Sequence, residues 1–196
     1  MRGLPSRAIE PITAADLLAR ARGRERHPVV VIDGFSGAGK TTLARELAEA
    51  DPGVTVESIE TFYLGWDGLA AGPRRASEQL VEPLRRGEVP VVSPWDWRRD
   101  QVGPSRRWVV SGLLVLEGVG AAARPLRDAA SLSVWVDATP AERDARLRAR
   151  DDWADYAPHR AGFERQEQAL EAAEGTRAAV DVIVRRDGGE WVRCRM

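Results

Sequence analysis

Apolar residues along this chain gather in short continuous runs, separated by stretches in which they recur with helical spacing. The continuous runs at 29–32 and 113–116 are typical of strands buried on both faces of a parallel sheet. Further strands are predicted at 54–59, 89–92, 108–110, 131–138 and 180–186. Helices are predicted at 14–22, 41–50, 76–87, 140–151 and 162–175. This alternation predicts an α/β fold, a doubly wound parallel sheet with ligands at the carboxyl ends of its strands.

Capping residues and prolines place the ends of several helices. Thr13 and Asp16 form a capping-box pattern at the start of a short N-terminal helix over about 13–22. Pro140 suits the first turn of its helix, whereas Pro83 predicts a kink in the helix at 76–87.

Composition and charge exclude several classes of function. The 196 residues show no repeat or linker, so one domain over 1–196 is expected. The formal net charge of −1 gives no electrostatic attraction to nucleic acid or to an anionic membrane. No apolar run reaches the ~18 residues of a membrane span, and no signal peptide is visible. With Cys194 as the only cysteine, a cytoplasmic protein is expected.

Residues 34–41 match the phosphate-binding pattern G-x-x-x-x-G-K-[ST] at every fixed position, between a predicted strand and a predicted helix. Glycines let the backbone N–H groups point inward at phosphate oxygens, and the following helix adds its positive end. The hydroxyl of Thr41 is expected to be a Mg²⁺ ligand. The residues predicted to bind the nucleotide are Gly34, Ser36, Gly37, Ala38, Gly39, Lys40, Thr41 and Thr42.

Lys40 is the only lysine among the 29 lysine and arginine residues of the chain. A lysine ammonium is a compact charge on a flexible stem that reaches the β- and γ-phosphates, where a planar arginine fork is too bulky. We therefore predict a catalytic role for Lys40 at a nucleoside triphosphate site. The absence of a second lysine argues against a Ras-like switch, whose N-K-x-D signature for guanine needs one.

Several further segments, in order from about 29 to 188, resemble the uridine kinase-like group of P-loop small-molecule kinases, which includes pantothenate kinase and phosphoribulokinase. Besides the loop they are ETFY at 60–63, WDW at 95–97, LLVLEG at 113–118, VDATPAERDARLRARD at 136–151 and VDVIVRRDG at 180–188. The resemblance implies a three-layer α/β/α P-loop fold with a helical lid at about 140–160. It also implies ATP and Mg²⁺ as cofactors and a small-molecule acceptor, most simply a nucleoside.

The same resemblance implies roles for two carboxylates at strand ends. Glu60 stands where the family has a catalytic aspartate, and it is expected to accept the proton of the acceptor hydroxyl or to help hold Mg²⁺. Its extra methylene leaves Asp33 and Asp67 open as alternative bases. Glu117 resembles the strand-end carboxylate that meets the water shell of the metal or the substrate, the alternative being a capping or salt-bridging residue.

Arg143, Arg146 and Arg150 share one face of the predicted lid helix because they are spaced three and four residues apart. In the family such arginines close over the phosphates and stabilise the transferred charge. For each one alone, an ion pair with a neighbouring acidic residue is the alternative. As a group they are predicted to be catalytic.

Aromatic residues mark the predicted acceptor site. Trp95 and Trp97 flank Asp96, and Trp66 lies in a glycine-flanked loop, so these rings either stack on a flat base or fill the core of their own loops. The predicted substrate-binding residues are Asp33, Tyr63, Trp66, Asp67, Arg74, Trp95, Asp96, Trp97 and Glu117.

Arg74 and Arg75 depart from the uridine kinase pattern, which has an acidic stretch at this place. Two arginines in the pocket would suit an acceptor that already bears a phosphate or a carboxylate, so a nucleoside monophosphate kinase is the alternative enzyme. A nucleotide-dependent regulatory switch without an acceptor is the alternative from another class, although Glu60 and the lid arginines favour a kinase. A monomer or a homodimer is expected.

Overall fold

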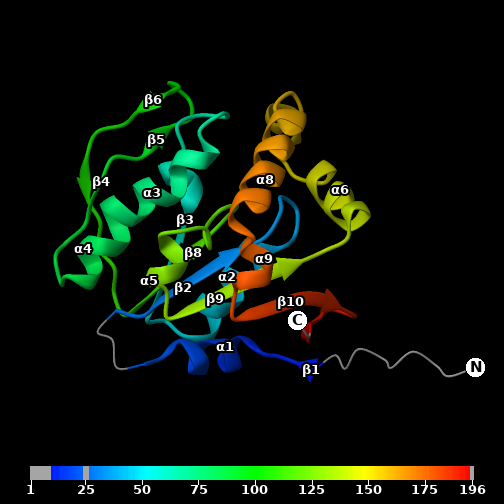
Figure 1. Ribbon diagram of the computed structural model, residues 1–196, viewed down its shortest axis with the longest axis horizontal. Helices are drawn as coiled ribbons and strands as arrows, with labels where there is room; N and C mark the ends of the chain where they lie inside the picture. Colours follow the sequence, from blue (N-terminus) through cyan, green and yellow to red (C-terminus); the bar gives the residue numbers. More distant parts are fainter. Residues whose placement is uncertain (1–9, 24–26, 195–196) are drawn as a thin grey trace, which may run out of the picture.

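The computed structural model describes residues 10–23 and 27–194. Its main sheet has seven strands in the order β1-β11-β10-β9-β2-β8-β3 (Figure 1). These strands are β1 (Glu10–Pro11), β2 (Val29–Asp33), β3 (Val54–Ser58), β8 (Leu113–Glu117), β9 (Leu132–Asp137), β10 (Val182–Asp187) and β11 (Glu190–Cys194). The five strands from β3 to β10 are parallel, whereas β11 and β1 are antiparallel additions at one edge. The predicted α/β fold with a mostly parallel sheet is confirmed.

Helices cover both faces of the sheet, because successive strand residues point to opposite sides. Ile32 of β2 packs with Leu43 of α2 (Lys40–Ala50) and with α1 (Ala14–Ala21) in one core cluster. Its neighbour Val31 belongs to the cluster on the other face. The elements there include η1 (Ile59–Phe62), η2 (Leu69–Ala71), α3 (Gly72–Ala76), α4 (Glu82–Arg85), α5 (Leu126–Ala129) and α8 (Arg160–Glu174). The three layers match the predicted architecture.

The segment expected to form a lid consists of two short helices that follow β9. They are α6 (Pro140–Arg148) and α7 (Trp153–Tyr156). Thr139 and Glu142 form a capping box at the start of α6, with Pro140 in its first turn. In Figure 1, α6 lies beside α8, and an ion pair between Arg160 and Asp144 joins the two helices. A further short helix, α9 (Thr176–Ala179), leads into β10.

The region between α4 and β8 contains two small antiparallel sheets, and here one predicted strand is wrong. β4 (Val91–Val92) pairs with β7 (Arg106–Arg107), and β5 (Trp95–Asp96) pairs with β6 (Gln101–Val102). The strand predicted at 108–110 is therefore replaced by β7, and Val109 is 80% exposed. Partner pairing, rather than the apolar run, determines where this strand lies. The apolar pattern also fails to predict β11 and the two-residue edge strand β1.

The helix predicted at 76–87 is confirmed, together with its distortion near Pro83. It begins at Gly72 and continues from α3 through a π-helical turn (Ser77–Val81) into α4. Proline has no N–H and its ring clashes with the preceding turn, which accounts for the wider turn before it.

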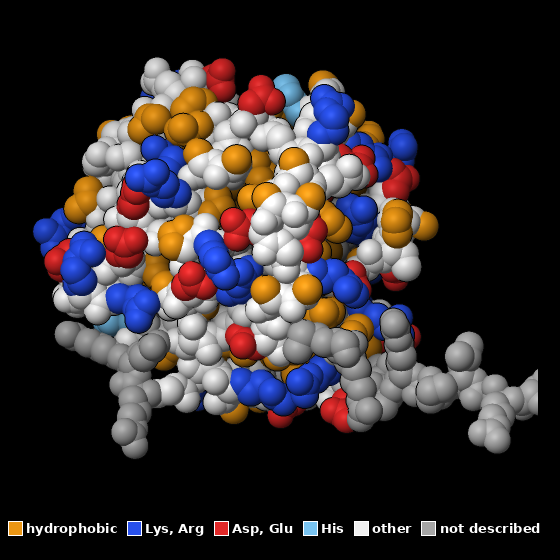
Figure 2. All heavy atoms as spheres, viewed as in Figure 1, with side chains coloured by type: hydrophobic (Ala, Val, Ile, Leu, Met, Phe, Trp, Pro, Cys, Tyr) orange, Lys and Arg blue, Asp and Glu red, His pale blue; other side chains and the backbone are white. Residues whose placement is uncertain are grey.

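Basic and acidic side chains are intermixed on the face shown in Figure 2. Exposed ion pairs between residues four apart on a helix, such as Arg148 with Asp144, are frequent in the structure. Within residues 10–23 and 27–194, no helix is both long enough and apolar enough to cross a bilayer.

Candidate active site

The phosphate loop connects β2 to α2, and its glycines allow the backbone to turn tightly. Gly34, Gly37 and Gly39 have φ values of +143°, +78° and +109°, which side-chain-bearing residues rarely adopt. A Cβ atom on Gly37 would lie 2.7 Å from the carbonyl oxygen of Arg143 in α6. The loop therefore depends on glycine both for its conformation and for its close contact with α6.

Lys40 lies at the start of α2 and is only 8% exposed. Its Nζ donates hydrogen bonds to the carbonyl oxygens of Gly34 at 2.8 Å and Phe35 at 3.1 Å. In the described part of the chain this ammonium forms no ion pair. The charge of Lys40 also lowers the pKa values of the buried carboxyls of Asp33, Glu117 and Glu167. A largely buried cation whose own hydrogen bonds go to carbonyl oxygens fits an anionic ligand such as a phosphate group.

A space of about 580 Å³ opens beside the loop, and we call it the phosphate hollow. It is lined by Ser36, Gly37, Gly39, Lys40, Thr41, Thr42, Ser58, Glu60, Glu117, Val119, Arg146 and Arg150. The hollow thus brings together the loop, both strand-end carboxylates and two lid arginines.

Thr41 and Glu117 provide the oxygen atoms that suit Mg²⁺. The Thr41 hydroxyl donates to Oε1 of Glu117 at 3.1 Å, and burial raises the pKa of Glu117. A hydroxyl and a carboxylate are the hard oxygen ligands that Mg²⁺ takes alongside phosphate oxygens and water. Across 10–23 and 27–194, no group of three or more His, Cys, Asp or Glu residues forms a metal cage. The donors present fit a metal ion that the nucleotide would share.

Asp33 does not line the phosphate hollow, although the sequence predicts it at the substrate site. Its Oδ1 accepts hydrogen bonds from the N–H groups of Gly34 at 2.7 Å and Gly120 at 2.9 Å. Its Oδ2 accepts one from Ala122 at 2.9 Å. Burial raises the pKa of this carboxyl to about 6. Asp33 therefore fixes the start of the phosphate loop against the loop that follows β8.

The three lid arginines occupy different positions around the phosphate loop. Arg143 donates to the carbonyl oxygen of Ser36 at 3.4 Å and lies over the ring of Phe35. Arg146 donates to the carbonyl oxygens of Gly37 at 3.2 Å and Ala38 at 2.9 Å.

Arg150 differs because its guanidinium forms a two-bond pair with Asp152, at 2.7 and 2.6 Å. It lines the phosphate hollow and also the cavity next to it. All three arginines are thus near the loop, and Arg146 and Arg150 face the hollow.

A second space of about 270 Å³ adjoins the phosphate hollow, and we call it the aromatic cavity. Its lining residues are Ser36, Glu60, Tyr63, Trp66, Trp97, Arg150, Asp152, Asp155, Tyr156 and Phe163. Trp66 contacts Trp97 with ring centroids 5.1 Å apart, and the ring of His159 stacks on Trp66 at 4.2 Å. The Tyr63 hydroxyl donates to the carbonyl oxygen of Val119 at 2.7 Å, which orients that ring.

Besides Asp33 and Glu117, four residues predicted at the acceptor site lie outside the aromatic cavity. The side chain of Arg74 is 81% exposed and pairs with Glu78. Asp96 accepts hydrogen bonds from the N–H groups of residues 98 and 99, so it shapes its own turn. Trp95 and the exposed Asp67 line a neighbouring hollow, which shares Trp66 and Phe163 with the aromatic cavity. Trp95 and Trp97 consequently face different spaces.

The sequence interpretation misses the contribution of the segment 152–167. Asp152, Asp155, Tyr156 and Phe163 line the aromatic cavity. Glu167 of α8, which is 2% exposed, accepts hydrogen bonds from Ser36 of the phosphate loop. A carboxylate on the same helical face as Phe163, four residues away, is the one sequence signal that could have revealed it.

Comparison with known proteins supports the fold. No family model matches the chain. A solved structure described as a possible uridine kinase from Bacillus stearothermophilus superposes with a TM-score of 0.64 at 19% identity, covering 87% of this chain and 94% of that one. A crystal structure of a putative fructose transport system kinase from Silicibacter sp. TM1040 superposes with a TM-score of 0.60 at 20% identity. The match covers 85% of this chain and 92% of that one.

A curated relative is also similar in sequence. The bifunctional pantoate ligase/cytidylate kinase of Prochlorococcus marinus (strain MIT 9303) is 28% identical over 206 residues. The match covers 85% of this chain but only 41% of that protein. Together with the sheet order and the phosphate loop, these similarities show that the chain has the P-loop fold found in uridine kinase-like kinases.

Proposed function

We propose that this protein transfers the γ-phosphoryl group of ATP to a hydroxyl group of a small molecule, most simply a nucleoside. The observation that carries the proposal is the position of Glu60. This exposed carboxylate lines both the phosphate hollow and the aromatic cavity, so it stands between the nucleotide site and a second binding space. Phosphoryl transfer requires an acceptor held in line with the phosphate and a residue that takes its proton.

The roles of the other residues follow from their positions. Lys40 and the N–H groups of the loop would hold the β- and γ-phosphates, and Arg146 and Arg150 would neutralise charge that develops during transfer. Bound Mg²⁺, held through Thr41 and water near Glu117, would supply further charge neutralisation. Glu60 would accept the proton of the acceptor hydroxyl. The aromatic cavity would exclude water from the transferred group.

The lining of the aromatic cavity favours an acceptor without a phosphate group. Arg150 is the one cation among its lining residues, and its charge is shared with Asp152 and with the phosphate hollow. Asp155 and Glu60 add negative charge, which disfavours a second anion. Flat rings of Trp66 and Trp97 suit stacking on a base. These features support a nucleoside over the nucleoside monophosphate that the name of the cytidylate kinase relative would suggest.

A phosphate-transfer screen by mass spectrometry tests the proposal. The protein would be incubated with ATP and Mg²⁺ against pooled nucleosides, nucleoside monophosphates, sugars and pantothenate-like alcohols. A product heavier by one phosphoryl group is expected in the nucleoside pool. Lys40→Ala should abolish this product, whereas Arg45→Ala, on the exposed face of α2, should leave it unchanged. Formation of ADP without any phosphorylated acceptor would favour the regulatory switch instead.

A further inference from the structure

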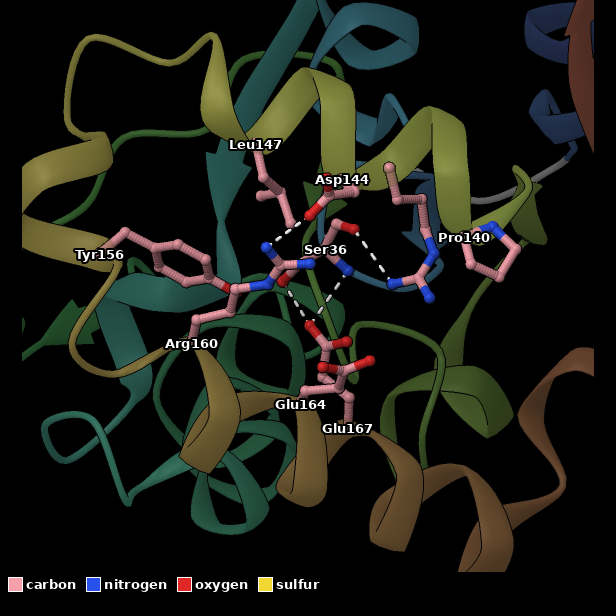
Figure 3. A pocket seen from close by; sticks show the side chains of 9 residues that line it. Ser36, Pro140, Asp144, Leu147, Tyr156, Arg160, Glu164 and Glu167 are labelled. Atoms are coloured by element: carbon pink, nitrogen blue, oxygen red, sulfur yellow. Dashed lines mark hydrogen bonds and ion pairs between the residues drawn. The ribbon is translucent and has the colours of Figure 1, made fainter.

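Helix α8 contacts both binding spaces through one side of its second turn. Phe163 forms part of the wall of the aromatic cavity. Gln166 donates a hydrogen bond from Nε2 to the carbonyl oxygen of Trp66 at 2.8 Å, which fixes another wall residue. Glu167 reaches the phosphate loop at Ser36 (Figure 3). Three residues within five positions therefore connect one rigid helix to both sites.

The peptide of Ser36 is held from two directions. Its N–H donates to Oε1 of Glu167 at 3.0 Å, and its hydroxyl donates to the same oxygen. Its carbonyl oxygen accepts a hydrogen bond from Arg143 of α6 at 3.4 Å. The phosphate loop is consequently clamped at this residue between α8 and α6.

Burial of the Glu167 carboxylate is unfavourable in free energy unless its oxygen atoms accept hydrogen bonds. It is 2% exposed, and burial raises the pKa of its carboxyl. The two hydrogen bonds recorded for it across 10–23 and 27–194 both come from Ser36, and a small polar cavity of about 60 Å³ surrounds the contact. A shift of the loop that lengthened these bonds would leave the carboxylate poorly solvated. Movement of the loop and movement of α8 are therefore energetically linked.

We propose that Glu167 is a positioning residue that couples the phosphate loop to the aromatic cavity through α8. When a nucleotide fixes the loop, Ser36 fixes Glu167, and the same helix then holds Phe163 and, through Gln166, the Trp66 segment. A filled phosphate hollow therefore restrains the aromatic cavity further than the same contacts do without a nucleotide. This inference rests on the proposed function, because it requires a nucleotide in the loop.

Amide hydrogen exchange with the non-hydrolysable analogue AMP-PNP and Mg²⁺ tests the coupling. In the wild type, saturating analogue should slow exchange in 62–68 and 160–170 by about fivefold or more, the lower end of typical coupling between sites. Glu167→Ala should still bind the analogue but lose this slowing in 62–68. Glu167→Gln, which keeps the accepting oxygen, should retain it.

Glu164→Ala is the matched control, because Glu164 lines the same small cavity one turn away and forms no hydrogen bond with the loop in the described structure. It should respond as the wild type does. If Glu167→Ala binds the analogue and slows exchange in 62–68 as much as the wild type, the coupling is refuted.

Should Glu167→Ala fail to fold, Ser36→Ala can be used instead, because it removes the hydroxyl that donates to Glu167 and leaves the N–H bond in place. A reduced slowing in 62–68 would support the coupling, and an unchanged one would overturn it. A wild-type protein that does not bind AMP-PNP at all would overturn the proposed function itself, which is a different result.

Discussion

Replacing Glu60 with glutamine separates catalysis from stability. Glu60 is exposed, and in the described structure its carboxylate forms no hydrogen bond or ion pair. The free energy of unfolding should therefore change by no more than about 0.5 kcal/mol. Loss of a general base typically lowers turnover by about 10² to 10⁴-fold. Such a loss corresponds to about 3 to 5 kcal/mol of transition-state stabilisation.

The assay is steady-state kinetics with the acceptor that the screen identifies, beside a thermal melt. For Glu60→Gln, kcat should fall by about 10² or more, while KM for ATP stays near the wild-type value because Lys40 and the loop are intact. Asp67→Asn is the control, since this other candidate base lines a different hollow. The assignment of Glu60 is refuted if its variant keeps near-normal kcat, or if Asp67→Asn shows the large loss instead.

Two further predictions concern residues that the structure places away from the reacting groups. Arg74→Ala should leave kcat/KM for the acceptor unchanged, because Arg74 forms only an exposed ion pair with Glu78. A tenfold rise in KM for the acceptor, which corresponds to about 1.4 kcal/mol of binding free energy, would show instead that Arg74 binds the acceptor. Burial raises the pKa of Asp33 from 3.8 to about 6, so the folded protein keeps a proton that the unfolded chain has lost. Its contribution should make the free energy of unfolding fall by about 3 kcal/mol in total, as the pH rises from well below 3.8 to well above 6. Urea titrations at several pH values should show that the stability of the wild type relative to Asp33→Asn decreases as the pH rises. A difference in their free energies of unfolding that does not depend on pH would contradict this prediction.

The phosphate loop and the buried parallel strands are predictable from sequence because local pattern determines them. The glycines and Lys40 lie within one short segment, and the apolar run of β2 is continuous. The role of Asp33 is not predictable in this way. Two of its three hydrogen-bond donors, Gly120 and Ala122, lie 87 and 89 residues away in sequence. Only the fold brings them to its carboxylate.

The acceptor side of the site illustrates the same limit. Arg74 and Arg75 are adjacent in sequence, yet Arg74 points to solvent whereas Arg75 donates to the carbonyl oxygens of Phe62 and Ser93. Which of the two faces inward depends on the phase of a helix whose π-helical turn follows them. Trp97 and Phe163 both line the aromatic cavity, although the turn between β5 and β6 carries one and α8 the other. Their meeting depends on tertiary packing rather than on local sequence.

The contacts of Arg143 and Arg146 with loop carbonyls also affect the thermodynamics of binding. Long arginine side chains lose up to about 2 kcal/mol of rotamer freedom when they become ordered. Here both guanidinium groups are already held beside the phosphate loop. Their rotamer entropy is therefore lost when the protein folds, and ligand binding does not have to order them again. An arriving nucleotide would exchange hydrogen-bond partners with the loop instead of immobilising free side chains. The protein thus holds its cationic groups preorganised, with its own backbone oxygens as temporary stand-ins for phosphate.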